Sequence, residues 1–236
     1  MTSRMKKMKF KTCLFIGIGS FIFVCMLILF FLLQPSGNIS EFASFQPDET
    51  IQNRKNQHQQ LPLKVSYFGV STLLFDDGKD QILIDGFLSR PSLTQVIFNK
   101  INSDPSLIHQ YIQQYDLKRT QAIFVTHSHY DHALDVPHLA QSLSHAKIVG
   151  SKSTLNIARG GDIPETQLIQ VRPFHSMTFG QFEVIAIPSK HTPPTAVNDD
   201  LGEEIKKPLI LPARFSAFKE GGSFDYLINY QGYKIL

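Results

Sequence analysis

From Leu61 onward the chain alternates short apolar runs with amphipathic stretches, a pattern that predicts strands alternating with helices. A buried strand is expected over Ala122-Ile123-Phe124-Val125, which is rich in β-branched and aromatic residues. Further strands are expected over residues 146–150, 167–171, 181–187, 224–229 and 233–236. This alternation favours an α/β domain in which helices pack on the faces of sheets.

Start and stop signals place the helices between these strands. Residues 91–115 are expected to be mostly helical, with an interruption before Asp104, which suits an N-cap and is followed by proline. Asp135 repeats this start signal for a second helix, because Val136-Pro137 follows it. A short helix over residues 153–159 is expected to end at the glycine pair that follows.

The N-terminal part of the chain has a different pattern. Residues 14–33 are a 20-residue run without a charged side chain, preceded by a basic segment over residues 1–13. Such a run predicts a transmembrane anchor, with the N-terminus in the cytoplasm and the domain on the extracytoplasmic side. Polar, Gln- and Asn-rich residues 34–60 are expected to be a spacer, which leaves residues 61–236 as the domain.

Two alternatives compete with the membrane anchor. A cleaved signal peptide would leave the domain secreted or periplasmic, but the apolar run is longer than usual and Gln34-Pro35-Ser36-Gly37 is a poor cleavage site. A buried core helix is disfavoured, since nothing downstream requires so uniformly apolar a partner. The anchor is therefore the preferred interpretation, and the membrane is an expected partner through residues 14–33.

Charge and cysteine content narrow the class of protein. The formal net charge is +3, but the basic segment supplies five positive residues, and the remainder carries 18 basic and 20 acidic residues. A nearly neutral body without a basic stripe argues against nucleic acid as a partner. Both cysteines, Cys13 and Cys25, lie outside the domain, so it has neither a disulfide nor a thiolate ligand.

The segment with the clearest chemistry directly follows the buried strand. His127, His129, Asp131 and His132 lie within six residues, in the run Thr-His-Ser-His-Tyr-Asp-His. In extended backbone the first two imidazoles leave the same side of the chain, and the other two groups follow in the turn toward a helix. Imidazole and carboxylate are the ligands that zinc-like metals prefer, so this pattern predicts a metal site.

The pattern His127-x-His129-x-Asp131-His132 resembles the signature of the metallo-β-lactamase superfamily of metal-dependent hydrolases. The resemblance extends over the opening hairpin at residues 65–75, the strand at residues 81–86 that reaches Asp85, the strand at residues 182–192 that delivers His191, and the hairpin at residues 224–236. It implies a four-layer αββα sandwich with the site at the carboxyl ends of strands.

The resemblance also implies the roles of the candidate site residues. His127, His129 and His191 would form a three-histidine zinc site with an open fourth position, where a metal-bound hydroxide attacks an ester, amide or phosphodiester-type bond. Asp131 and His132 would begin a second metal site, and Asp131 would orient the nucleophile as the catalytic carboxylate. Asp85 would support the ligand loop by accepting hydrogen bonds.

The resemblance further implies that the domain is incomplete at the C-terminus, because a bridging aspartate and a last ligand histidine would follow Leu236. We therefore expect one tightly bound Zn²⁺ in this chain, where a full-length relative would hold two. We also expect an apolar sheet face and an unpaired edge to be left uncovered. The alternative function is a truncated, catalytically inactive metal-binding remnant.

No motif selects the substrate, because one scaffold supports many hydrolytic reactions. A small-molecule or lipid-like substrate is the expected partner. Residues 192–222 form a long segment that is expected to hang over the site as a lid or substrate wall. Arg214 lies in that segment and is a candidate for pairing with a substrate anion.

Overall fold

The structure is a computed structural model that describes residues 17–28, 63–192 and 200–236. The chain separates into two units, residues 1–59 and 60–236, which are described separately. The predicted spacer over residues 34–60 lies outside the described residues.

The prediction of a membrane-spanning anchor is contradicted. Residues 17–28 form a helix, and among the helices that the structure describes none is both long and apolar enough to cross a bilayer. A span requires roughly 20 helical residues, because each residue adds about 1.5 Å and the hydrocarbon core is about 30 Å thick. The single-pass topology and the membrane location that rested on residues 14–33 are therefore corrected; the ends of that run lie outside the described residues.

The larger sheet has six strands in the order β1-β2-β3-β4-β5-β6. Its first three strands form antiparallel pairs, whereas β3 to β6 run parallel to one another. The strands are β1 (Lys64–Gly69), β2 (Thr72–Asp76), β3 (Gln81–Ile84), β4 (Thr120–Phe124), β5 (Lys147–Gly150) and β6 (Leu168–Gln170). The central strands β3 and β4 are almost fully buried, as expected for parallel strands covered on both faces.

The smaller sheet has four antiparallel strands in the order β10-β9-β8-β7. They are β7 (Ser176–Phe179), β8 (Phe182–Ser189), β9 (Ser223–Tyr230) and β10 (Tyr233–Ile235). Buried and partly buried residues alternate along β8 and β9, so each strand presents one face to the core. Strands β8, β9 and β10 correspond to the strands predicted over residues 181–187, 224–229 and 233–236.

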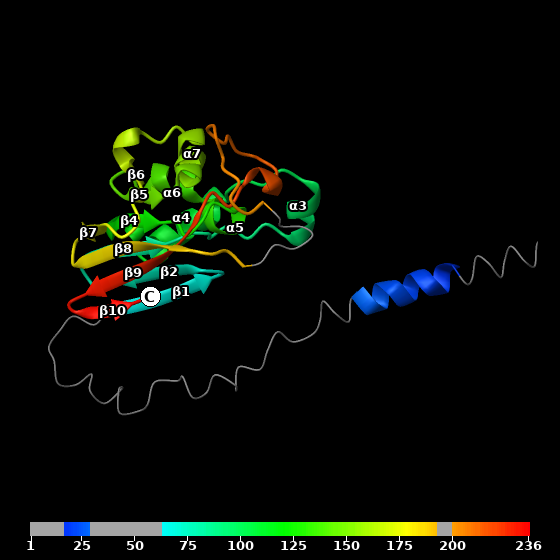
Figure 1. The fold of residues 1–236 in the computed structure, drawn as a ribbon, viewed down its shortest axis with the longest axis horizontal. Helices are drawn as coiled ribbons and strands as arrows, with labels where there is room; N and C mark the ends of the chain where they lie inside the picture. The colour runs from blue at the N-terminus through cyan, green and yellow to red at the C-terminus, as the bar shows by residue number, and fades with distance from the viewer. Residues whose placement is uncertain (1–16, 29–62, 193–199) are drawn as a thin grey trace, which may run out of the picture. The chain divides into compact units, whose positions relative to one another are not determined.

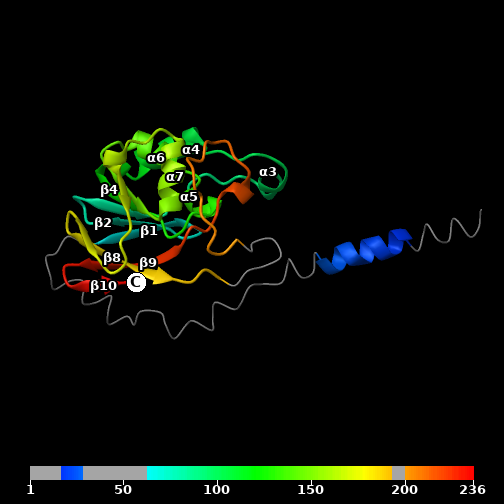
Figure 2. The ribbon, with the colours of Figure 1, turned by 45° about the horizontal axis from the view of Figure 1, so that its top comes forward.

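Helices cover the outer face of the larger sheet, and the smaller sheet packs on its other face (Figures 1 and 2). The helices are α3 (Leu93–Phe98), α4 (Pro105–Gln114), α5 (Tyr130–Ala133), α6 (Val136–Ser142) and α7 (Lys152–Gly160), with short 3-10 turns η3 (Leu117–Arg119), η4 (Glu165–Gln167) and η5 (Phe215–Ala217). One apolar cluster lies under these helices and a second lies between the sheets. The described part of the chain thus forms three layers of the predicted αββα sandwich.

Asp104 and Asp135 both precede helices as predicted, but only Asp104 caps its helix with its side chain. The side chain of Asp104 accepts hydrogen bonds from the backbone at the start of α4, as an N-cap does. Asp135 precedes α6 but does not cap it. Its carboxylate instead accepts hydrogen bonds from the backbone N–H groups of Leu88 and Ser89, at 2.7 and 2.6 Å. Asp135 therefore ties α6 to the segment after β3.

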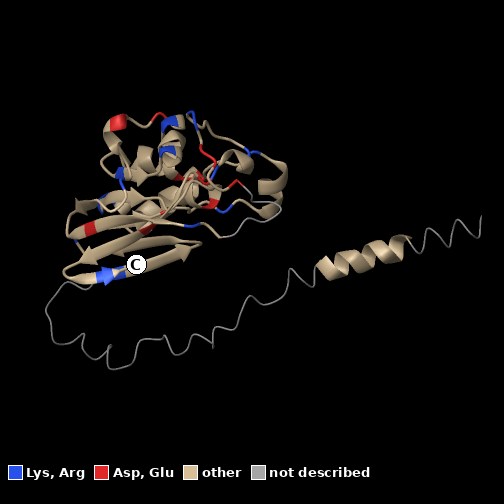
Figure 3. Ribbon diagram, viewed as in Figure 1, with Lys and Arg blue, Asp and Glu red and all other residues tan. Residues whose placement is uncertain are grey.

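Charged residues of both signs are interspersed over the domain (Figure 3). A two-pronged ion pair joins the end of β2 to the start of β4, because both terminal nitrogens of Arg119 donate to Asp76, at 2.8 and 2.7 Å. Burial alone would raise the pKa of Asp76, but hydrogen bonds from Arg119 and Gln81 outweigh it and lower that pKa to about 2. The pair therefore favours the folded state wherever Asp76 is ionised.

The variant Asp76→Asn should lower the free energy of unfolding by about 1–2 kcal/mol at neutral pH, because it removes a charge-assisted pair. The folded-state pKa lies below the ordinary value of 3.8, so this contribution is complete above about pH 4 and disappears as the pH falls toward 2. Denaturant unfolding of both proteins across this range measures the difference.

The matched control is Glu165→Gln, which removes the exposed ion pair with Arg159 and should leave the unfolding midpoint unchanged. A destabilisation by Asp76→Asn that stays constant down to pH 2 would contradict this account of the pair.

Candidate metal centre

The predicted ligands come from the ends of strands in two different sheets. In the larger sheet β4 ends at Phe124, and the loop that follows carries His127 and His129 and leads into α5, which carries Asp131 and His132. In the smaller sheet β8 ends at Ser189, and His191 follows two residues later. Histidines far apart in the sequence can therefore meet at one edge of the sandwich.

Two hydrogen bonds join the sheets at this edge. The backbone N–H of Phe224 in β9 donates to the carbonyl oxygen of Thr126 at 2.9 Å. The hydroxyl of Tyr226 donates to the carbonyl oxygen of Val125 at 2.8 Å. Burial raises the pKa of Tyr226 well above its usual value, so this hydroxyl keeps its proton and remains a donor. Because β9 pairs with β8, these bonds fix the histidine loop relative to His191.

His127, His129 and His191 form a nearly equilateral triangle of imidazole rings. The ring centroids are 4.8 Å apart for His127 and His129, 4.7 Å for His127 and His191, and 4.8 Å for His129 and His191. One ligand atom from each residue lies within 4.8 Å of the others. The first two side chains are buried and His191 is half-buried. Three nitrogens converging in this way can hold one metal ion.

The hydrogen bonds of the three rings leave one nitrogen of each ring for a metal. Nδ1 of His127 lies 3.2 Å from the hydroxyl of Thr126, and Nδ1 of His191 lies 3.0 Å from the carbonyl oxygen of Thr192. Nε2 of His129 lies 3.1 Å from a carboxylate oxygen of Asp200, to which it must donate. A proton on the bonded nitrogen places the lone pair on the other nitrogen, as metal-binding histidines require.

His127 provides the test of whether a metal fits these residues. Its Nε2 is buried and has no hydrogen-bond partner among the described residues. Burial, and then the neighbouring His132, His129 and His191, lower the pKa of His127 to about 2. The imidazole is therefore neutral at physiological pH and presents a lone pair that no other group satisfies. A buried nitrogen of this kind is costly unless it is bonded, and a metal ion would satisfy it.

Asp131 and His132 lie beside the three-histidine group. The ring centroid of His132 is 3.9 Å from that of His127, and its Nε2 is 3.8 Å from a carboxylate oxygen of Asp131. Burial alone would lower the pKa of His132, but the hydrogen bond and charge of Asp85, with a contribution from Asp131, raise it. The structure thus brings all five predicted site residues together, and the ligand atoms that converge most closely are those of the three histidines.

Asp85 fixes the histidine loop after β4 through hydrogen bonds to Thr126 and His132. Its side chain is fully buried, and one carboxylate oxygen accepts a hydrogen bond from the backbone N–H of Thr126 at 2.8 Å. The other oxygen accepts from Nδ1 of His132 at 2.9 Å and from the hydroxyl of Ser71. These hydrogen bonds are the geometry that the supporting role expected for Asp85 requires. Ser71 and Thr126 complete the network, and no pattern in the sequence singled them out.

Asp200 is a site residue that sequence reasoning did not single out. It contacts His129 although the two are 71 positions apart, and only 14% of its side chain is exposed. Glu220 holds the segment behind it by accepting from the backbone N–H of Gly202 at 2.6 Å and the hydroxyl of Ser223 at 2.7 Å. The only signal was indirect, since the long segment after His191 was expected to cover the site. Residues 193–199 of that segment lie outside the described residues.

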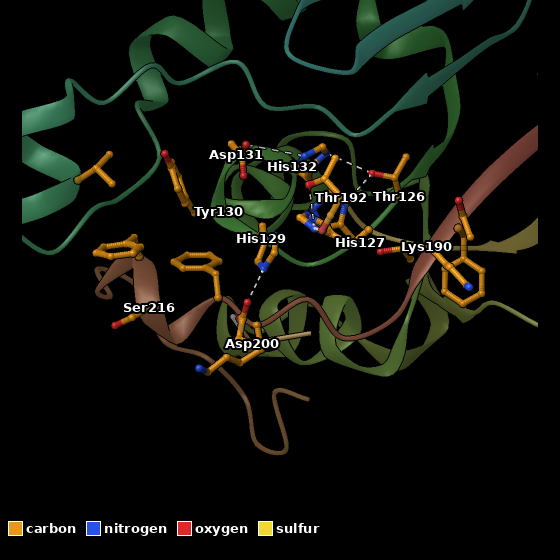
Figure 4. Close-up of a pocket in the computed structure, with 18 of the residues that line it drawn as sticks. Thr126, His127, His129, Tyr130, Asp131, His132, Lys190, Thr192, Asp200 and Ser216 are labelled. Carbon is orange, nitrogen blue, oxygen red and sulfur yellow. Dashed lines mark hydrogen bonds and ion pairs between the residues drawn. The ribbon is translucent and has the colours of Figure 1, made fainter. Parts of the chain in front are cut away.

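The five predicted residues line a cavity of about 1020 Å³. Figure 4 shows His127, His129, His132 and Asp131 around the middle of this cavity, with Asp200 below His129. Arg214, a candidate for binding an anion, does not line the cavity and donates instead to the carbonyl oxygen of Phe98 at 3.5 Å. An open cavity beside the histidines would admit water and a substrate to a bound metal.

Comparisons with solved structures return distant likenesses. Igni18, a metallo hydrolase from the archaeon Ignicoccus hospitalis, is 16% identical, covers 73% of this chain and 58% of its own, and has a TM-score of 0.42. MEM-A1, a subclass B3 metallo-beta-lactamase from a soil metagenome library, is 19% identical, with coverages of 71% and 55% and a TM-score of 0.41. A Cronobacter sakazakii metallo-beta-lactamase is 19% identical, with coverages of 52% and 50% and a TM-score of 0.38.

At this level of similarity these structures support no conclusion about activity. The chain spans about half to three-fifths of the length of each. No curated protein matches the chain.

The family model gives the stronger result. The model described as the metallo-beta-lactamase superfamily matches residues 66–215, which include Asp85 and the five predicted site residues. This match spans more than half of the chain and agrees with the sandwich of two sheets and with the ligand loop after β4. The chain therefore belongs to the metallo-beta-lactamase superfamily, whose members are metal-dependent hydrolases.

Proposed function

We propose that this chain is a zinc-dependent hydrolase acting on an ester, amide or phosphodiester-type bond of a small-molecule or lipid-like substrate. The observation that carries the proposal is the buried Nε2 of His127, which lacks a partner among the described residues and faces two further histidines. Neutral imidazole is a preferred ligand of zinc, and three such ligands leave one position for water or substrate. Family membership supports the hydrolytic class of reaction.

His127, His129 and His191 would hold one zinc ion. A zinc ion supplies Lewis acidity, because it lowers the pKa of a coordinated water molecule and polarises a carbonyl or phosphoryl oxygen. Asp200 would keep the ring of His129 in position by accepting its Nε2 proton. Asp85 would do the same for His132 through Nδ1.

Asp131 is the proposed catalytic carboxylate. Its side chain is 38% exposed and lines the cavity next to the three histidines. A carboxylate in that position can accept a hydrogen bond from the attacking water and hold it in line with the substrate. The ring of His132 is less exposed than Asp131, and its Nδ1 is engaged by Asp85 while its Nε2 lies 3.8 Å from a carboxylate oxygen of Asp131.

The first prediction from the proposed function concerns metal content. The purified chain should bind about one zinc ion tightly, because among the described residues only the three histidines provide a converging set of nitrogens. His127→Ala should lose that zinc, whereas His109→Ala, which changes an exposed histidine on α4, should keep it. Elemental analysis after dialysis against a weak chelator measures the stoichiometry. Two tightly held ions per chain, or zinc retained by His127→Ala, would refute the ligand assignment.

The second prediction concerns hydrolysis. The zinc-loaded chain should hydrolyse at least one member of a panel containing a p-nitrophenyl ester, bis-p-nitrophenyl phosphate and a chromogenic lactam. His129→Ala should abolish that activity with the metal, and His109→Ala should not change it. Zinc binding without turnover of any of the three bond classes would favour the alternative of an inactive metal-binding protein.

The third prediction separates catalysis from metal binding. Asp131→Asn should retain the zinc ion but lower kcat by roughly 10²–10⁴-fold, the usual range for loss of a general base. The side chain keeps its size, so KM should change much less. Zinc content and steady-state kinetics on the same preparation provide the two readouts. Full activity in the zinc-loaded variant would remove Asp131 from the mechanism.

A further inference from the structure

The cavity has an apolar arm that the proposed mechanism does not use. It extends from the histidines toward α3 and η5, and Figure 4 shows Tyr130 and the neighbouring aromatic rings on that side of His129. We use the name apolar arm for the part of the cavity lined by Leu93, Val96, Ile97, Tyr130, Phe215 and Phe218.

Helix α3 presents two apolar side chains, Leu93 and Ile97, to this arm, while Val96 also packs in the core. Val96 is buried and anchors the helix, but Leu93 and Ile97 are 72% and 47% exposed although both line the cavity. They are four residues apart and therefore share one side of the helix. The helix carries no charged residue, and Figure 3 shows it without one. A single exposed leucine is ordinary, but several large apolar residues on one cavity wall indicate a binding surface.

The walls of the arm are held in place before any ligand arrives. Ile101, just after α3, and Ala213, just before η5, form a two-bond bridge with N–H to carbonyl distances of 2.7 and 3.1 Å. At its start α3 has a capping box between Ser92 and Gln95. A binding site whose walls are fixed loses little conformational entropy on ligand binding.

Tyr130 connects the arm to the metal centre. It directly follows His129, and its ring centroid lies 6.5 Å from that of Phe215 and 6.1 Å from that of Phe87, in edge-to-face arrangements. The ring of Tyr130 is thus held between the histidines and the aromatic wall. A molecule that fills the arm can reach the three histidines with its other end, since both belong to one cavity.

We propose that the apolar arm binds the hydrocarbon chain of the substrate, so that the substrate is an amphiphile whose hydrolysable head lies at the three histidines. The proposal rests on the proposed function and names its substrate class. The chain enters between α3 and η5, passes Tyr130, and carries the scissile bond to Asp131 and the metal ligands. The fixed, continuous cavity favours a bound small molecule over a partner protein.

The first experiment tests the arm without metal or turnover. The fluorescent apolar probe N-phenylnaphthylamine is titrated into the metal-free full chain, and octanoate is then used to displace it. The double variant Leu93→Ser/Ile97→Ser should bind the probe at least about tenfold more weakly, because two apolar contacts are lost. Leu93→Met, which keeps an apolar wall, should bind like the wild type.

The control is Ile210→Ser. Ile210 is 73% exposed, like Leu93, but does not line the cavity, so this variant should bind the probe normally. Any background binding of the probe to apolar residues elsewhere in the chain is the same in this variant as in the double variant. Equal probe affinity in the double variant, the control and the wild type would overturn the proposal.

The second experiment tests the connection to the metal centre. Straight-chain hydroxamates from acetyl to octanoyl are titrated into the zinc-loaded chain, so that the head binds the metal and the tail enters the arm. Affinity should rise up to about fourfold for each added methylene in the wild type, and the gain should be largely lost in the double variant.

Affinity independent of tail length would overturn the proposal. If the chain cannot be loaded with zinc but its probe affinity still depends on Leu93 and Ile97, the apolar arm is supported while the proposed hydrolase function fails. The two failures are therefore distinguishable.

Discussion

The buried carboxylate of Asp85 is the constraint on which the rest of the site depends. It lies at the end of β3, fully excluded from water, with a left-handed backbone at φ 58°. A buried carboxylate is costly unless donors surround it, and here the backbone of Thr126, the ring of His132 and the hydroxyl of Ser71 all bond to it. Satisfying Asp85 therefore forces the loop after β4 into the shape that presents His127.

The second requirement is that two sheets meet at one edge. The loop after β4 supplies two histidines, but His191 comes from the end of β8, and only the packing of the smaller sheet on the larger one brings it near. The buried tyrosine Tyr226 and the backbone of Phe224 fasten β9 to the residues before the histidines. The metal centre thus depends on the apolar core between the sheets, because that core sets their distance.

The sequence predicted those parts of the domain that local patterns determine. The apolar run before His127 and the alternation before His191 placed both ligand loops, and Asp104 marked the start of α4. Asp200 was not predicted as a site residue, because its contact with His129 is set by tertiary packing over 71 positions and has no local signature. The membrane anchor predicted over residues 14–33 was wrong, because no helix in the described part of the chain is long and apolar enough to cross a bilayer.

The most direct test of the account is X-ray absorption at the zinc edge on the zinc-loaded full chain. Three imidazole ligands at about 2.0–2.1 Å are expected, with one further light-atom ligand from water. His191→Ala should reduce the imidazole scattering to that of two rings, because the smaller sheet contributes only that ligand to the group. A spectrum dominated by carboxylate oxygens, or one that does not change in His191→Ala, would contradict a three-histidine centre built between the two sheets.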